Sequence, residues 1–218
     1  PGDYSGACFE LTRDIDLGGM EWIPIGFYRN SSQIHSAHIP AFQGRFDGNG
    51  KTISNFRLYR PDWSHMGLFG AVRDSEITDL TVSPGHVITA GETAGILAGS
   101  VQDSVIRNVA VAGALKTAGN TGGIAGEIAD TVVENCTADH VAMDLGKGKE
   151  TFAGGIAGKA AGSVISDCTV NTGDSLNARI QGGGYVGGIT GFQNDTDIFN
   201  VHVMGTIGGS GSQAIGGV

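Results

Sequence analysis

The chain has 218 residues, of which 38 are glycine, 40% are hydrophobic and 16% are charged. Glycine therefore exceeds its usual share of roughly 7%, and charged residues fall below their usual share of roughly 25%. This composition is too apolar for a disordered tail, and 5 prolines are too few for collagen or a proline-rich linker. The net charge of −9 argues against binding to nucleic acid or to an anionic membrane surface. No apolar run reaches the roughly 18 residues that predict a membrane span, so membrane insertion is not expected.

Two motifs recur along the chain at a nearly constant phase. The first is glycine, hydrophobic, variable, glycine, and its copies begin at Gly67, Ile96 (which replaces the glycine), Gly123, Gly155 and Gly188. The second follows ten residues after each start and reads apolar, any, Asn or Asp, apolar, any, apolar. Two further copies of the second motif lie upstream, which gives seven Asn or Asp positions: Asp14, Asn55, Asp79, Asn108, Asn135, Asp167 and Asn200.

This repeat predicts an all-β, single-stranded parallel β-helix of about seven coils. Periods of 20 to 50 residues are typical of solenoids and propellers, and so many glycines exclude helical repeats. The repeats are also too short for propeller blades of about 40 residues or more. The Asn or Asp position of the second motif breaks the apolar alternation, so we expect this residue at a corner of the coil. Asn and Asp tolerate left-handed backbone angles, and stacked copies would form a structural ladder along the helix.

The coil pattern covers residues 1–218, with lead-in coils in 1–66 and regular repeats in 67–218. Two polar, aperiodic stretches in the lead-in, 27–41 and 59–65, are expected to be loop excursions. Gly217 and Val218 match the opening of another glycine motif, so we expect the β-helix to be truncated at its C-terminal end and to continue into flanking repeats of a longer polypeptide.

These residues resemble the GLUG-motif family of bacterial repeats, whose signature is seen at Gly67-Leu68-Phe69-Gly70. The lead-in stretches, Phe9 to Leu17, Trp22 to Gly26 and Phe42 to Ile53, are also similar to that family. The resemblance implies a right-handed parallel β-helix on secreted or surface-anchored bacterial proteins. Such proteins include adhesins and the non-catalytic regions of immunoglobulin A metalloproteases.

The sequence shows no converging catalytic set, metal site or cofactor site. None of the six histidines lies in the His-Glu-x-x-His context of a zinc protease, and His35 and His38 have no adjacent carboxylate. The nearest acid pairs are Asp195 with Asp197 and Asp14 with Asp16. Glycoside cleavage would require such a pair in a groove, but Asp also simply favours turns.

The cysteines Cys136 and Cys168 fall in one inward column on successive coils. Parallel side chains one rung apart fit disulfide geometry poorly, so two buried thiols are favoured over a bridge, which stays an alternative. Cys8 has no partner that the sequence identifies.

Exposed aromatic residues are the remaining functional indication. Tyr28, Tyr59 and Trp63 fall in or beside the two expected excursions, where aromatic faces suit contacts with a host protein or glycan. The competing interpretation is that they cover the core of the first coils.

The resulting hypothesis is a non-catalytic extracellular module, secreted or attached to the cell surface, for adhesion, binding or stalk presentation. Two alternatives stay open. One is an accessory region of an immunoglobulin A-type metalloprotease whose catalytic domain lies outside this chain, and the other is a carbohydrate-active β-helix enzyme.

Overall fold

A computed structural model describes residues 6–26, 41–145, 150–173, 179–181, 184–208 and 214–216. Within these ranges the chain forms 25 strands and no helix, and neighbouring strands pair in parallel in three sheets. No helix in the described ranges is long and apolar enough to cross a bilayer. The front sheet contains β5 (Phe69–Arg73), β9 (Ala98–Gln102), β12 (Ala125–Ala129), β16 (Ala157–Ala161) and β21 (Thr190–Asn194). The third sheet contains β8 (Ala94–Gly95), β11 (Thr121–Gly122), β15 (Phe152–Gly154), β20 (Tyr185–Gly187) and β25 (Ala214–Gly216).

The long sheet holds the remaining strands. They are β1 (Ala7–Glu10), β2 (Ile15–Glu21), β3 (Gly44–Arg57), β4 (Tyr59–Arg60), β6 (Glu76–Gly85), β7 (Ile88–Ala90), β10 (Val105–Thr117), β13 (Val132–Glu134), β14 (Thr137–Leu145), β17 (Val164–Ser166), β18 (Thr169–Asn171), β19 (Arg179–Gln181), β22 (Asp197–Phe199), β23 (His202–Met204) and β24 (Thr206–Ile207).

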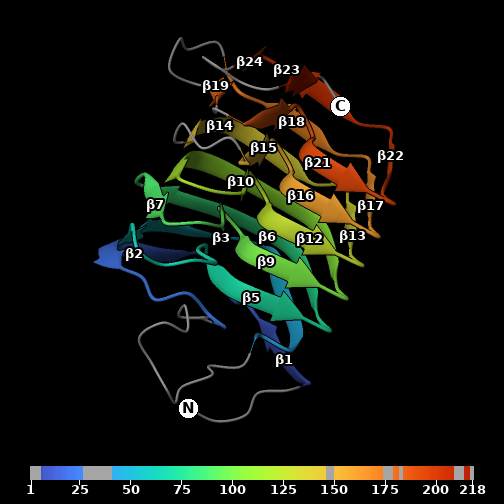
Figure 1. Ribbon diagram of the computed structural model, residues 1–218. Helices are drawn as coiled ribbons and strands as arrows, with labels where there is room; N and C mark the ends of the chain where they lie inside the picture. The colour runs from blue at the N-terminus through green and yellow to red at the C-terminus, as the bar shows by residue number, and fades with distance from the viewer. Residues whose placement is uncertain are drawn as a thin grey trace, which may run out of the picture.

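Each turn of the molecule visits the three sheets in the same order. The chain passes from β5 in the front sheet to β6 and β7 in the long sheet, then to β8 in the third sheet, and returns to the front sheet at β9. Figure 1 shows these turns stacked from the N-terminal to the C-terminal end in a right-handed sense. The structure is therefore the parallel β-helix that the repeat predicts.

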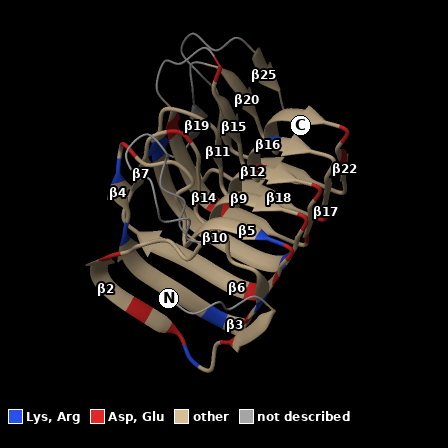
Figure 2. Ribbon diagram, turned by 60° about the horizontal axis from the view of Figure 1, so that its bottom comes forward, with Lys and Arg blue, Asp and Glu red and all other residues tan. Residues whose placement is uncertain are grey.

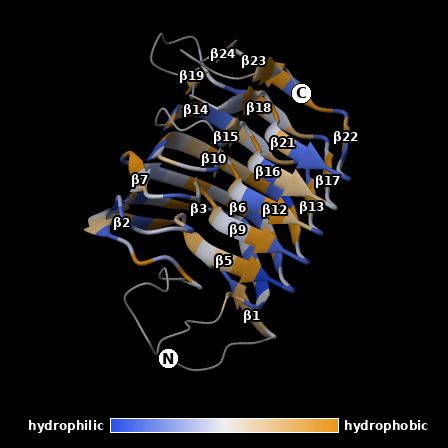
Figure 3. Cartoon of the chain, in the orientation of Figure 1, coloured by the Kyte–Doolittle hydropathy of each residue, from blue (hydrophilic) through white to orange (hydrophobic). Residues whose placement is uncertain are grey.

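The inward-facing residues of the repeat stack directly on one another. Ile106 pairs with Val133 and Val133 pairs with Ile165, each on the adjacent rung, and all three side chains are fully buried. Hydrophobic and hydrophilic residues alternate along the strands in Figure 3, as expected when one face of each sheet lines the core. Residues about thirty apart in sequence thus share backbone hydrogen bonds and one continuous core.

The number of coils differs from the expected seven. Seven rungs occur only on the main path of the long sheet, whereas the front and third sheets have five strands each. In the first coil the front sheet is reduced to two isolated bridges, Ile25 with Phe69 and Phe42 with Val72. The described residues therefore make five complete three-sided turns, preceded by lead-in rungs.

The two expected excursions have different outcomes. The first, 27–41, lies outside the described residues except for Ala41, and the chain on either side of it pairs with β5. The second, 59–65, differs from the expectation, because Tyr59 and Arg60 form β4 and Tyr59 pairs with Thr89. Because Met66 then bridges to Ala94, residues 61–65 are an ordinary corner between the long and third sheets. Gly217 and Val218 also lie outside the described residues.

An Asn/Asp ladder runs along the corner inside the long sheet. Asp79, Asn108, Asn135, Asp167 and Asn200 all have positive φ, between 51° and 55°. The Asn108 amide donates to the Asp79 carboxylate at 2.9 Å, Asn135 donates to Asn108 at 2.7 Å, and Asn200 donates to Asp167 at 3.3 Å. All five rungs thus share a left-handed bend, and Asn108, Asn135 and Asn200 each add a side-chain hydrogen bond to the rung below.

The predicted places of Asn55 and Asp14 in this ladder are wrong. In β3 the residues between Asp47 and Lys51 lie opposite Asp79 alone, so Asn49, with φ of 50°, occupies the ladder level. This bulge shifts the later part of β3 by two residues. Asn55 therefore donates to Asp16 at 2.9 Å at a different bend, and the Asp14 carboxylate accepts the backbone N–H of Thr52 at 2.8 Å.

We expect Asn108→Ala to lower the free energy of unfolding by about 2 kcal/mol, because it removes two exposed amide hydrogen bonds and places a Cβ-bearing residue without a polar group at φ of 55°. Asn108→Gly removes the same hydrogen bonds without the backbone strain and should cost about 1 kcal/mol. Urea unfolding followed by circular dichroism measures both. If both variants unfold at the midpoint of the parent protein, the ladder contributes nothing to stability.

Candidate functional site

The corner between β4 and the third sheet carries two of the three predicted aromatic residues, and Tyr28 lies outside the described residues. Tyr59 is 65% exposed. Trp63 is half-buried and packs against the hydrophobic core, and the guanidinium carbon of Arg60 lies 5.1 Å from the centre of its ring. Trp63 therefore contributes to covering the core, and Tyr59 is the freely accessible ring at this corner.

An ion pair fixes the same corner. Arg60 Nη2 donates to Glu21 Oε2 at 2.7 Å, which joins β4 to the strand one coil below. The hydrogen bond and the charge of Arg60 lower the pKa of the Glu21 carboxyl below its ordinary value. The guanidinium thus lies between a carboxylate and an indole, beside the exposed Tyr59.

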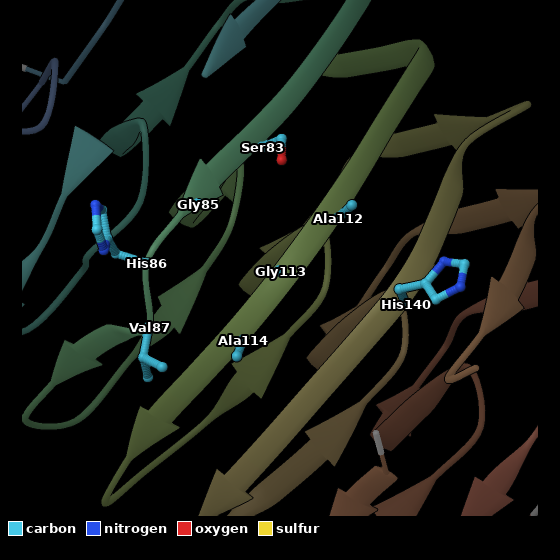
Figure 4. A pocket seen from close by; sticks show the side chains of 8 residues that line it. All are labelled: Ser83, Gly85, His86, Val87, Ala112, Gly113, Ala114 and His140. Atoms are coloured by element: carbon cyan, nitrogen blue, oxygen red, sulfur yellow. The ribbon is translucent and has the colours of Figure 1, made fainter. Parts of the chain in front are cut away.

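A cavity of about 330 Å³ opens on the outer face of the long sheet (Figure 4). It is lined by Ser83, Gly85, His86, Val87, Ala112, Gly113, Ala114 and His140. His140 has φ of 50°, and its Nδ1 lies 2.8 Å from a carboxylate oxygen of Asp139. Ser83 and His140 belong to β6 and β14, which are separated by β10 and hence lie about 9.6 Å apart along the axis. This distance excludes the hydrogen bond that a serine–histidine nucleophile requires.

The corner between the front and long sheets carries a second ladder, which the sequence analysis missed. Asp74, Asp103, Asp130 and Asp195 have φ of 47° to 49° and are each followed by Ser or Thr. In Figure 2 acidic residues repeat along this edge, where a shallow cavity of about 580 Å³ runs past three of them. The available signal was an Asp four residues after the last glycine of the first motif, at Gly70, Gly99, Gly126 and Gly191, and three residues before the first apolar residue of the second motif. The fourth copy has Gly162 at this position.

Hydrogen bonds account for the hydroxyls of this second ladder. Ser104 Oγ donates to the carbonyl of Gln102 at 2.6 Å and accepts the backbone N–H of Ser75 at 3.1 Å. On the coil where Gly162 stands in place of the Asp, Ser163 Oγ donates to the carbonyl of Ala161 at 2.8 Å and accepts the backbone N–H of Thr131 at 3.2 Å. These hydroxyls connect successive coils, so their role here is structural.

The two acid pairs singled out from the sequence do not have the environment of a glycosidase pair. Asp195 belongs to the second ladder. Asp16 accepts the backbone N–H of Gly18 at 2.8 Å and the amide of Asn55, and these bonds lower the pKa of its carboxyl. A general acid for glycoside cleavage needs a raised pKa, so the shift at Asp16 has the opposite sign.

His35 and His38, the closest pair of histidines, lie outside the described residues. Across the described ranges, no group of three or more His, Cys, Asp or Glu side chains is placed to hold a metal ion.

The thiols of Cys8, Cys136 and Cys168 are all free. Cys136 and Cys168 are buried, whereas Cys8 is exposed. Each buried thiol contacts a carbonyl two residues earlier, Glu134 at 3.3 Å and Ser166 at 3.1 Å. The neighbouring thiol of Cys168 and burial raise the pKa of Cys136 well above its ordinary value. Cys136 therefore behaves as a small apolar core residue and not as a reactive thiolate.

An aromatic cluster on the upper coils is the feature with the clearest chemistry, and the sequence analysis missed it. We define it as Phe152 on β15, Tyr185 on β20 and Phe192 on β21, together with Lys159 on β16. The ring of Phe152 lies 5.4 Å from Tyr185 and 5.1 Å from Phe192, centre to centre, and Lys159 Nζ lies 6.0 Å from the Phe192 ring. The available signal was their position: Phe152 and Tyr185 lie three residues before a Gly-Ile-x-Gly motif, and Lys159 and Phe192 directly follow one.

No family model matches this chain. It is 33% identical over 112 residues to a candidate Gly-rich membrane protein of Evansella cellulosilytica, a match that covers 47% of this chain and 12% of that protein. It is 31% identical over 116 residues to halomucin of Haloquadratum walsbyi, covering 49% of this chain and 1% of that protein.

A crystal structure of a candidate immunoglobulin A1 protease from Bacteroides ovatus superimposes with a TM-score of 0.51 and 21% sequence identity. That similarity covers 95% of this chain and 60% of the other, and at this identity it establishes a shared fold alone. The chain therefore spans only part of each protein that it resembles, and membership of the GLUG-motif family stays a prediction.

Proposed function

We propose that this chain is a non-catalytic, extracellular β-helical module that presents a binding surface, as part of a larger secreted or surface-attached protein. One observation carries this proposal. The polar groups at two corners of the β-helix form hydrogen bonds between successive coils, while large side chains such as Tyr59 are left exposed. The resemblance to halomucin and to a candidate Gly-rich membrane protein supports an extracellular place for the module.

Flanking repeats of the same polypeptide are proposed as its neighbours along the axis. In the last coil Ile198, Val201 and Val203 are only half-buried, whereas the equivalent residues one coil below, Ile165, Cys168 and Val170, are fully buried. A further coil would cover this apolar surface and pair the open strand edges.

A second candidate function is an accessory region of an immunoglobulin A-type metalloprotease. The fold shared with the candidate protease of Bacteroides ovatus favours it. A His-Glu-x-x-His motif elsewhere in the full-length polypeptide would support this candidate, and a full-length polypeptide without a protease domain would exclude it.

The test of the binding module is a screen of the purified 218-residue chain against host proteins and glycans, with Tyr59→Ala as the matched variant. Tyr59 is exposed, so its replacement should leave the melting temperature unchanged, whereas Trp63→Ala would also remove packing against the core. A ligand whose binding Tyr59→Ala weakens supports the Tyr59 corner as a contact surface. Cleavage of a glycan or protein by the purified chain would overturn the non-catalytic proposal.

A further inference from the structure

The aromatic rings of the upper coils are not required by the fold. Residues at the level of Phe152 and Tyr185 on the lower coils are Thr93 and Asn120, as the register of the third sheet shows. At the level of Phe192 the lower coils carry Ala71, Ser100 and Glu127 before Lys159. The same backbone geometry is therefore built below without a ring, so packing within the coil does not explain the three aromatic residues.

The aromatic cluster is accessible to solvent, and its members come from the front and third sheets. Tyr185 is 37% exposed and Phe192 is 41% exposed, and Phe152 lies between them with contacts to both rings. Above Tyr185 the next residue in register is Ala214, which is too small to cover the ring. Large aromatic side chains left at the surface in one place are typical of a contact site.

The charge beside the rings is positive, on a chain with a net charge of −9. Lys159 is in register with Glu127 one coil below, but the Glu127 carboxylate accepts the amide of Asn120 at 2.6 Å. Within the described residues, Lys159 forms no salt bridge, and its ammonium group is held near the face of Phe192. The cluster thus offers an anion a single cation next to exposed aromatic faces.

We infer that the aromatic cluster binds a carboxylated sugar. One face of a pyranose ring carries C–H groups that pack on an aromatic ring, and its hydroxyls can bond to the Tyr185 hydroxyl and to the polar groups of Asn120 and Glu127. A carboxylate on the sugar would meet the Lys159 ammonium in a charge-assisted hydrogen bond. This ligand class uses all parts of the cluster: the aromatic faces, the cation and the hydrogen-bonding groups. The site is separate from the Tyr59 corner.

The test is a titration of the 218-residue chain, followed by NMR, with two acidic probes and their neutral counterparts. The probes are trigalacturonate against its methyl ester, and 3′-sialyllactose against lactose, which separates plant-type from animal-type acidic sugars. We expect at least one acidic probe to bind at concentrations up to about 10 mM and its neutral counterpart to bind at least about five-fold more weakly. Tyr185→Ala and Phe192→Ala should each weaken binding about ten-fold.

The charge variants keep the inference falsifiable even if an aromatic variant folds poorly. Lys159→Gln should abolish the preference for the acidic probe, and Lys159→Arg should restore it, at unchanged melting temperature. Tyr59→Ala should bind like the parent protein. The inference is overturned if neither acidic probe binds, if the neutral probes bind as tightly, or if Lys159→Gln and the aromatic variants bind within about two-fold of the parent. Binding lost in Tyr59→Ala alone would likewise overturn it, while supporting the Tyr59 corner as the contact surface.

Discussion

Gly158→Ala should prevent this chain from folding normally or lower its free energy of unfolding by about 3 kcal/mol or more. A Cβ at this position would lie 2.5 Å from the backbone nitrogen of Thr121 and 2.7 Å from the carbonyl oxygens of Gly126 and Phe152. All three atoms are backbone atoms of neighbouring strands, so no side chain can rotate away to relieve the clash. The front and third sheets would have to separate at this corner.

The matched control is Gly208→Ala, because a Cβ at Gly208 would meet no atom within 4 Å. Urea midpoints and circular dichroism spectra of the two variants should be compared under identical conditions. We expect the Gly208 variant to unfold at the parent midpoint or slightly above it, since alanine restricts the unfolded chain more than glycine does. Equal midpoints for the two variants would show that close backbone approach is not the reason for glycine at the end of the motif.

Phe69→Ala should cost about 3 to 5 kcal/mol, the range for a phenylalanine truncated in a closed core. Phe69 is fully buried on β5, and its ring centre lies 5.2 Å from Phe42 and 5.5 Å from Phe46. The three rings join the first complete turn to the lead-in rungs, so the cavity would open where the front sheet is reduced to isolated bridges.

Phe192→Ala provides the control on the same sheet, since Phe192 is 41% exposed on β21. It should cost less than about 1.5 kcal/mol, because less apolar area returns to water and the gap is open to solvent. The measurement is the urea midpoint, compared within this pair because a solenoid can unfold in more than one step. A Phe69 variant as stable as the Phe192 variant would contradict the assignment of the three-ring core.

The repeat made the stacking of the regular coils predictable. A period near thirty residues places Ile106, Val133 and Ile165 on adjacent rungs, because parallel strands can share hydrogen bonds and a core only when equivalent residues are aligned. For the same reason the ladder from Asp79 to Asn200 was predictable. The prediction failed at Asn55 and Asp14, since the bulge between Asp47 and Lys51 changes the register without disturbing the motif that follows it.

The sequence by itself determined the β-helix, the contents of its core and the ladder of its regular coils, because a repeated pattern specifies which residues lie above one another along the axis. Only the tertiary structure decided which residues meet across the corners. Phe152 and Phe192 are forty residues apart and belong to different sheets, and their contact at 5.1 Å depends on the angle at which the third and front sheets join. At this corner the backbone packs closely around glycines such as Gly158. The repeat shows where these glycines recur, but not which side chains of neighbouring coils meet across the corner.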